Sequence, residues 1–181
     1  ADNPFIGTDG ALSDIYSYGH RNPQGLIIDQ STGNIWATEH GPQGGDELNL
    51  IKPGANYGWP VVGFGVNYGS GSAIHSATQG EGMENPSHIW VPSIALSGLM
   101  MYRGDKFPAW NGNIFAGGMA GQQLARLTVD GEMVMKEETL LQRLGRIRDV
   151  REGPDGYIYV AIEDRRGAPT PIVRLEPAGG R

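Results

Sequence analysis

Four polar residues that could bind a charged, planar ligand stand directly before an apolar run. Residues 20–24 read His-Arg-Asn-Pro-Gln, and the apolar run 26–28 follows them. An arginine guanidinium presents a planar fork of donors that matches a carboxylate bidentately, and the two amides add donors and acceptors. The segment therefore suits a planar ligand with several carboxylates. The alternative is a loop whose polar side chains cap the backbone of neighbouring strands.

Residues 39–47 contain the oxygen ligands that a hard cation prefers. The segment reads Glu-His-Gly-Pro-Gln-Gly-Gly-Asp-Glu, and its glycines and proline predict an irregular loop whose carbonyls can converge on one point. Asp46 and Glu47 are the available carboxylates, and Asn49 is close to them. Carbonyl and carboxylate oxygens together are typical Ca²⁺ ligands, although the spacing is not that of an EF-hand loop. A surface turn with solvated carboxylates is the alternative.

Two arginines form a third candidate for anion binding. Arg146 and Arg148 are two positions apart, so in a strand they share one face. Two neighbouring guanidiniums repel each other unless an anion lies between them. The alternative is an exposed strand face with salt bridges, such as Arg148 or Arg151 to Glu152, and surface pairs of that kind contribute little stability.

Several aromatic residues lie close to these polar segments in the sequence. Tyr57 and Trp59 follow the second segment, and Trp90 and Tyr102 lie further along the chain. Such residues can stack on a sugar or a flat cofactor, but aromatic side chains more often fill a core.

Several classes of protein lack their sequence signatures here. The absence of cysteine removes disulfides, thiolate catalysis and cysteine metal sites. There is no glycine-rich nucleotide-binding motif, no His-Glu-x-x-His and no Gly-x-Ser-x-Gly, and the four histidines do not have zinc-ligand spacing. The formal net charge of −6 disfavours nucleic-acid binding, and no apolar stretch is long enough to span a membrane. We therefore expect neither a nucleic-acid partner nor a membrane span.

Three similar segments indicate a repeated turn and strand. Each has a turn pair that ends in glycine, at Gly33, Gly112 or Gly156, followed by an alternating apolar strand. The glycines are 79 and 44 residues apart, so the first spacing is a little under twice the second. A repeat of about 40–50 residues built from short strands is typical of propeller blades. With 29 glycines and 12 prolines, the chain suits short strands and tight turns more than long helices.

The other expected elements also fit an all-β protein. Residues 132–144 read either as a short helical turn or as a strand and a loop, and residues 63–88 form the longest loop, expected over the ligand-binding end. At about 45 residues per blade the chain supplies about three to four blades, so it is a small propeller or part of a larger one. Further strands are expected at 26–29, 46–51, 94–102, 123–129, 146–151 and 171–175.

Taken together, the polar segments match the motifs of a known family. The stretches "GHRNPQGL", "EHGPQGGDELNLI", "GANYGWP", "RIRDV" and "GPDGYIYV" occur in this order. The chain resembles the soluble dehydrogenases that use pyrroloquinoline quinone (PQQ), and it is most similar to their aldose sugar dehydrogenase branch. The likeness covers nearly the whole chain and is weakest over residues 63–88. Since that family fold is a six-bladed β-propeller, the resemblance implies a single domain, residues 1–181, that forms the C-terminal part of the propeller and lacks the N-terminal blades.

The resemblance also implies a cofactor site. In the family, PQQ lies with a Ca²⁺ in a central cleft, and some members hold a second, structural Ca²⁺. The implied calcium ligands are the carbonyls of Gly41 and Pro42 for the first ion, and Glu47 with the Tyr57 carbonyl for the second. The implied PQQ contacts are Arg21, Asn22, Gln24, Ser93, Arg146 and Arg148, with Arg146 also stabilising developing charge.

The implied reaction is the PQQ- and Ca²⁺-dependent oxidation of aldose sugars at C1 to lactones. The family's catalytic base is a histidine in an earlier blade, so we expect none in this chain and no activity from the chain alone. Ala120 stands where some members place a lysine on PQQ.

The implied partners are an aldose substrate, an external electron acceptor and the missing half, supplied by a separate chain or by self-association. The implied location is periplasmic or secreted. The alternative is a non-catalytic propeller module that binds sugar or protein, because one fold supports many functions.

Overall fold

The computed structural model describes residues 3–178, which form eleven strands and one short 3₁₀-helix. No helix in this part of the chain is long and apolar enough to cross a membrane. The elements are β1 (Pro23–Ile28), β2 (Ile35–Glu39), β3 (Asp46–Ile51), β4 (His88–Trp90), β5 (Leu96–Met101), η1 (Pro108–Trp110), β6 (Ile114–Gly118), β7 (Gln123–Asp130), β8 (Met133–Leu140), β9 (Arg146–Glu152), β10 (Ile158–Glu163) and β11 (Ile172–Leu175).

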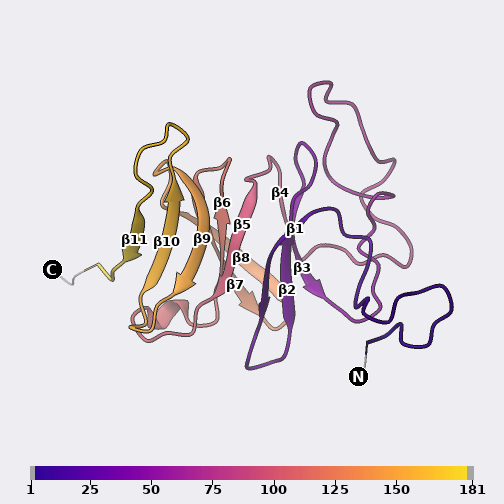
Figure 1. Ribbon diagram of the computed structural model, residues 1–181, viewed down its shortest axis with the longest axis horizontal. Helices are drawn as coiled ribbons and strands as arrows, with labels where there is room; N and C mark the ends of the chain where they lie inside the picture. The colour runs from indigo at the N-terminus through magenta and orange to yellow at the C-terminus, as the bar shows by residue number, and fades with distance from the viewer. Residues whose placement is uncertain (1–2, 179–181) are drawn as a thin grey trace.

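The strands pair into three antiparallel sheets that stand side by side (Figure 1). Their strand orders are β1-β2-β3-β4 (blade A), β5-β6-β7-β8 (blade B) and β11-β10-β9 (blade C). The first strand of each blade contacts that of the next, β1 against β5 and β5 against β9. Meandering sheets arranged around a shared axis are the blades of a β-propeller. The predicted all-β propeller architecture is therefore confirmed, with three blades in the described part of the chain.

The repeated turn occupies the same place in each blade. Gly33, Gly112 and Gly156 lie between the first and second strands of blades A, B and C, with φ angles of 80°, 80° and 79°. Glycine adopts this left-handed conformation without the steric cost that other residues incur. The 79-residue interval between Gly33 and Gly112, however, does not contain two repeats. The repeat of blade A is itself long, because residues 52–87 form an irregular connection between β3 and β4.

Two glycines allow the first strands of the blades to approach closely. A Cβ at Gly25 on β1 would clash with Leu99 on β5, and a Cβ at Gly98 on β5 would clash with Asp149 on β9. Each contact joins the early part of one first strand to the early or middle part of the next. The far ends of these strands meet as well, because Arg103 just after β5 pairs with Asp29 just after β1, and its backbone N–H donates to Glu152 at the end of β9. The three first strands therefore run in the same direction, and their starting ends lie together.

Two apolar cores lie between the blades. The first fills the space between blades A and B around Trp36 and Leu99, and the second lies between blades B and C around Phe115 and Ile147. The alternation in β10 shows how the sequence forms the second core, because Ile158, Val160 and Ile162 are all buried while the residues between them are not. Blade B thus contributes an apolar face to each core, and blades A and C contribute one each.

Two elements differ from the expectation. Residues 88–90 form the strand β4, although residue 88 was assigned to the long loop, and residues 133–140 form the strand β8, so the helical alternative there is wrong. The long loop folds back onto the turn between β2 and β3. Its residue Val66 exchanges two backbone hydrogen bonds with Gln43, of 3.0 and 3.1 Å, in the turn between β2 and β3.

Candidate functional site

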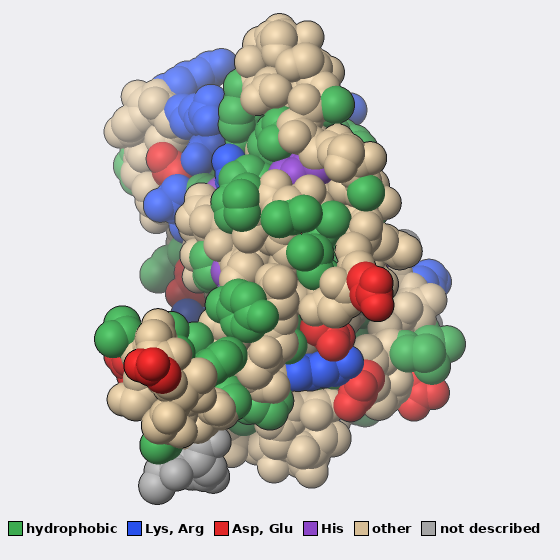
Figure 2. Space-filling model, turned by 90° about the vertical axis from the view of Figure 1, so that its right-hand side faces the viewer, with side chains coloured by type: hydrophobic (Ala, Val, Ile, Leu, Met, Phe, Trp, Pro, Cys, Tyr) green, Lys and Arg blue, Asp and Glu red, His purple; other side chains and the backbone are tan. Residues whose placement is uncertain are grey.

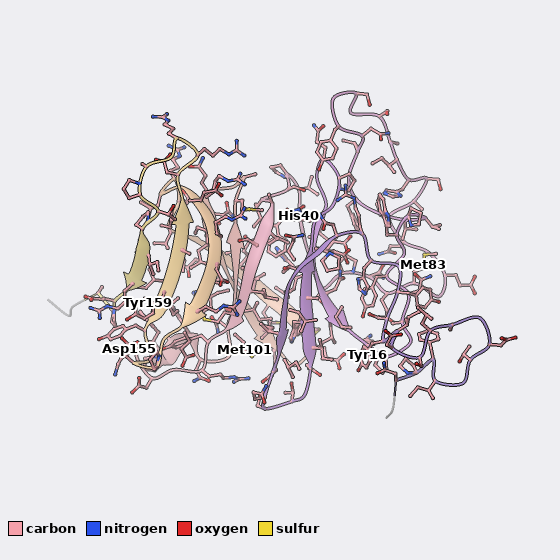
Figure 3. All side chains as sticks on the ribbon, viewed as in Figure 1. Tyr16, His40, Met83, Met101, Asp155 and Tyr159 are labelled. Carbon is pink, nitrogen blue, oxygen red and sulfur yellow. The ribbon has the colours of Figure 1, made fainter. Side chains whose placement is uncertain are left out.

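The residues predicted for the site lie at one end of the blades. Arg21 directly precedes β1, Ser93 precedes β5, and Arg146 is the first residue of β9. Since the starting ends of these strands lie together, three segments far apart in the sequence meet at the same end of the molecule. Figure 3 shows His40 at this end, between β5 and the strands of blade A. Its Nε2 lies 2.6 Å from the carbonyl oxygen of Leu96, which joins the two blades.

Arg21 is held by the turn that contains the predicted calcium ligands. Its Nη1 donates to the carbonyl oxygens of His40 and Gly41, each at 2.9 Å. Its guanidinium lies over the ring of Trp59, 5.2 Å from the centroid, which is within the range of a cation–π contact. The Gly41 carbonyl, which the resemblance assigns to Ca²⁺, therefore also accepts a hydrogen bond from the protein.

Glu39 connects the polar groups behind this turn. Its Oε2 accepts a hydrogen bond of 2.6 Å from the backbone N–H of Arg21, and its Oε1 lies 3.1 Å from Nδ1 of His20. The other ring nitrogen of His20 lies 2.9 Å from Ser17 Oγ, and the ring stacks on Tyr57 with centroids 4.4 Å apart. The histidine is thus fixed on both nitrogens and on one face, so it positions the loop.

Two carboxylates stand next to each other in blade A, Glu39 buried and Glu47 partly buried. Glu39 and Glu47 are paired residues of β2 and β3, so their side chains leave the sheet on the same face. Asn49 Nδ2 donates to both, at 2.8 Å to Glu39 and 3.2 Å to Glu47. Burial raises the pKa of Glu47 to about 7, and the negative charges of Glu39 and Asp46 add to the rise. A bound cation would relieve this cost of ionisation.

All four predicted calcium ligands line one small cavity. Gly41, Pro42, Glu47 and Tyr57 surround a space of about 20 Å³, together with Glu39. A space of this size holds about one water molecule or one ion. The carboxamide oxygen of Asn49 is buried without a hydrogen-bond partner in the described part of the chain. Within that same part, no three His, Cys, Asp or Glu side chains are grouped to hold a metal, so carbonyl oxygens would have to complete a coordination shell.

Both carboxylate oxygens of Asp46 are engaged by backbone N–H groups, in contrast to the sequence interpretation of a free anion. Its Oδ1 accepts from the backbone N–H of Gly41 at 3.1 Å, and its Oδ2 from that of Ala95 at 2.7 Å. The side chain is 1% exposed, so the alternative of a solvated surface carboxylate is also wrong for this residue. Asp46 instead shapes the turn and ties it to the segment before β5.

Asn22 and Gln24 lie together on the exposed rim of the site. Gln24 Nε2 donates to Asn22 Oδ1 at 3.0 Å and to the carbonyl oxygen of Pro23 at 3.1 Å. Gln24 also lines an open cavity of about 310 Å³ that contains Arg148 and Met119. The first and third polar segments of the sequence therefore share one hollow.

The two arginines of β9 point to the same side, as the strand pattern predicts. Arg146 Nε and Arg148 Nη1 lie 3.2 and 3.5 Å from the same oxygen of Glu163. Both guanidiniums also contact the sulfur of Met119, at 3.4 and 2.7 Å. The alternative of a strand face with salt bridges is correct except for the partner, since Arg148 pairs with Glu163 and Arg151 with Asp149. The carboxylate of Glu152 instead accepts backbone hydrogen bonds at residues 103 and 104.

The remaining candidates divide between the site and the core. Ser93 has a buried hydroxyl with no hydrogen-bond partner among the described residues. Trp59 lines the small cavity beneath Arg21. The core interpretation is correct for the other aromatic residues, because Tyr57, Trp90 and Tyr102 are all buried.

Sequence reasoning missed three residues that organise the site. Glu39 could have been found from the pairing of β2 with β3, which places it beside Glu47. Glu163 could have been found in the same way, because it is the partner of Arg146 in the β9–β10 pairing. Met119 has no such signal, because its contact with the arginines depends on how blade B packs against blade C.

Comparisons with known proteins agree with this arrangement. The family model described as "Glucose / Sorbosone dehydrogenase" matches residues 1–174. The aldose sugar dehydrogenase YliI of Escherichia coli is 45% identical over 92% of this chain and 45% of its own length. A crystal structure of glucose dehydrogenase superimposes with a TM-score of 0.90 at 45% identity, covering 98% of this chain and 51% of that one.

A cofactor-bound structure is also similar. The PQQ-bound aldose sugar dehydrogenase of Streptomyces coelicolor has a TM-score of 0.72 at 31% identity, with coverage of 96% of this chain and 47% of that one. The chain therefore spans about half the length of the relatives it matches. Since the family model covers nearly all of the sequence, the chain belongs to the glucose/sorbosone dehydrogenase family.

Proposed function

We propose that this chain is the cofactor-binding half of a PQQ- and Ca²⁺-dependent aldose dehydrogenase that oxidises the sugar at C1 to a lactone. The observation that carries the proposal is the meeting of arginine, amide and carbonyl groups at one end of three blades, from Arg21 and Gln24 on one side to Arg146 and Arg148 on the other. The names of the relatives and the PQQ-bound neighbour support it.

The side chains present fit a flat ligand with several carboxylates. Arg146 and Arg148 share the single carboxylate of Glu163, so the pair keeps a net positive charge for an anion. Arg148 and the Gln24 amide line the same hollow. Ser93 adds a buried hydroxyl that lacks a partner among the described residues. In this proposal Arg21, Asn22, Gln24, Ser93, Arg146 and Arg148 bind PQQ.

The small cavity of blade A fits a hard cation. It is lined by Glu47, Gly41, Pro42 and Tyr57, and the carboxylate and carbonyl oxygens that these residues carry are of the kinds that suit Ca²⁺. The raised pKa of Glu47 shows that its negative charge is costly without a counter-charge. Since this cavity has room for one ion, we assign Glu47 and the Tyr57 carbonyl to a structural ion inside it, and the carbonyls of Gly41 and Pro42 to a second ion, outside it and beside PQQ.

Each group has a physical task in this proposal. Bound PQQ supplies the acceptor of two electrons, and Ca²⁺ beside it acts as a Lewis acid. Arg146 and Arg148 orient the carboxylates and stabilise negative charge that develops near them. Arg21 fixes the carbonyls of residues 40 and 41, and Trp59 supports the Arg21 guanidinium through a cation–π contact.

The proposal includes the parts that this chain does not supply. Three blades in about half the length of the relatives imply about six blades in the complete ring, and we place the catalytic base in the other half, as a separate chain or as further sequence. We place the protein in the periplasm or outside the cell on the strength of the family resemblance. An external electron acceptor would reoxidise the cofactor.

The proposal is tested by titrating the chain with PQQ in the presence of Ca²⁺ while following quinone absorbance and tryptophan fluorescence. We expect saturable one-to-one binding that a chelator abolishes. Arg148→Ala should weaken binding by about tenfold or more, because a charge-assisted hydrogen bond is lost. The matched control is Arg174→Ala, an exposed arginine on β11 that forms an ion pair with Glu176.

Two results would contradict the proposal. The first is a folded chain that binds no PQQ either alone or when mixed with the blades that complete the ring, and this result would favour a non-catalytic binding module. The second is an equal loss of affinity in Arg148→Ala and Arg174→Ala, which would show that binding depends on overall charge alone.

A further inference from the structure

A second open cavity lies beside the arginine pair, on the side away from Gln24. It measures about 590 Å³ and is enclosed by the turn after β6, the turn before β9 and the loop between β10 and β11. This loop lies at the upper end of blade C in Figure 1, and Figure 2 shows Lys and Arg side chains gathered at the same end. Ligand pockets in proteins have volumes of about 300–1,000 Å³, so the cavity can hold a molecule the size of a sugar.

The cavity is strongly basic in an otherwise acidic chain. Four arginines line it, namely 143, 146, 165 and 166, against two acidic residues. Both acids are already engaged, because Glu163 pairs with Arg146 and Asp164 accepts the backbone N–H of Arg166. Across residues 3–178, no carboxylate lies within 4.0 Å of the other three guanidiniums. Their charge is therefore available to a ligand.

The backbone around the cavity is held in an unusual conformation. Gln122 and Arg143, both lining residues, have φ angles of 47° and 64°, and the N–H of Arg143 donates to the carbonyl of Gln122 at 2.9 Å. Residues other than glycine rarely adopt this conformation, and where they do they are often found at ligand sites. The turn conformation places Arg143 at the cavity wall although it costs energy locally.

We propose that this cavity binds the acidic group of a sugar that carries a carboxylate or a phosphate. Arginine forks match both groups, since each presents paired oxygens to two parallel N–H donors. Arg143, Arg165 and Arg166 provide the donors, and Arg146 lies between this cavity and the hollow assigned to PQQ. The conclusion that the ligand is a sugar rests on the proposed function. The conclusion that the cavity binds an anion rests on its geometry alone. The substrate class is thereby narrowed to acidic aldoses.

The pocket is testable in this chain because all of its lining residues belong to blade C and its junction with blade B. Calorimetric titration would use glucuronate, glucose 6-phosphate, glucose and inorganic phosphate as probes at low ionic strength. We expect saturable binding of one or both sugar acids and none of glucose. The double substitution Arg165→Gln, Arg166→Gln should weaken binding by about tenfold or more. Tighter binding of glucuronate would assign a carboxylate, and tighter binding of the phosphate ester would assign a phosphate.

The control is Arg174→Gln, which removes an exposed arginine of β11 outside the cavity and should leave binding unchanged. Absence of binding by both sugar acids, or an equal loss in the control, would overturn the proposal. Equal affinity for inorganic phosphate would overturn the assignment of a sugar.

A PQQ titration of the same variants separates this proposal from the proposed function. We expect Arg165→Gln, Arg166→Gln to retain PQQ binding. A loss of PQQ affinity as large as the loss of sugar-acid affinity would show that the cavity belongs to the cofactor. Sugar-acid binding in a chain that never binds PQQ would leave the anion pocket standing and overturn the proposed function.

Discussion

At the scale of single residues, the two carboxylates of blade A pose an electrostatic problem. Glu39 and Glu47 are adjacent across two strands and share one amide donor, the side chain of Asn49. Like charges in a buried position disfavour each other's ionisation. Glu39 is also hydrogen-bonded to the backbone of Arg21, so its side chain is held in place beside Glu47. In the proposed site a cation at Glu47 would compensate the negative charge of this carboxylate.

This leads to a prediction for Glu47→Gln. We expect Ca²⁺ to stabilise the unsubstituted chain by about 3 kcal/mol when the free ion is at about a hundred times its Kd, and we expect the substitution to remove this gain. Thermal unfolding with Ca²⁺ and with chelator measures both. Glu81→Gln, at an exposed position of the long loop, is the control that should keep the gain. An unchanged Ca²⁺ effect in Glu47→Gln would place the ion elsewhere.

At the scale of elements, one carboxylate links the outer strands of blades A and B. Glu137 on β8 accepts a hydrogen bond of 3.0 Å from Trp90 Nε1, and its other oxygen lies 3.0 Å from His88 Nε2, both on β4. Strand β4 has only three residues, so these contacts supply much of its attachment to the neighbouring blade. The hydrogen bond from His88 lowers the pKa of Glu137.

The sign of this shift predicts the pH dependence of stability. A carboxyl with a lowered pKa in the folded state stabilises the fold above its unfolded value, about 4.3, and this stabilisation is lost as the pH falls through the folded value. We expect Glu137→Gln to cost about 1 kcal/mol at pH 7 and much less near pH 3. Urea unfolding at both pH values measures the difference, and Glu132→Gln, in the exposed turn before β8, serves as control. A cost that does not change with pH would rule out the charge as its origin.

At the scale of the whole molecule, blade A presents an apolar face that no described element covers. Leu26 and Ile28 are 64% and 51% exposed. A cavity of about 300 Å³ with an almost wholly apolar lining lies on the same face, between Leu26, Ile35 and Ile51. Figure 2 shows the side of the molecule on which the long loop and the N-terminal segment lie in Figure 1, with hydrophobic side chains among the other surface groups. Surfaces of this kind mark interaction sites, which agrees with a face that packs against a further blade.

The prediction at this scale concerns Leu26→Lys. In the isolated chain we expect the substitution to reduce self-association, measured by sedimentation velocity, because it places a charge on the uncovered face. In the complete propeller we expect it to cost about 2–3 kcal/mol of stability, the contribution of one buried leucine. Met133→Lys, at an exposed position of β8, should have neither effect. Self-association that persists in Leu26→Lys would show that another surface is responsible.

The local parts of this structure could be read from the sequence. The glycine turns at 33, 112 and 156 and the alternating strands after them are set by neighbouring residues, so the strand type and the propeller class were predictable. The three-residue strand β4 was not, because three residues show no alternation and the strand forms only by pairing with β3. The 79-residue interval between Gly33 and Gly112 was also misleading, because it suggested two repeats. The long connection between β3 and β4 that fills it is irregular, and an irregular segment has no periodic signal in the sequence.

The sequence by itself determined the chemical character of the site, namely arginines, amides and a glycine-proline turn, because these depend only on residue types and short spacings. Tertiary structure decided which groups meet. Strand register brings Glu39 to Glu47 and Glu163 to Arg146, and the packing of one blade on the next brings Met119 between two arginines. The basic cavity needs turns from two blades and one hairpin loop. Contacts between segments far apart in the chain depend on the whole fold, so only the tertiary structure could show them.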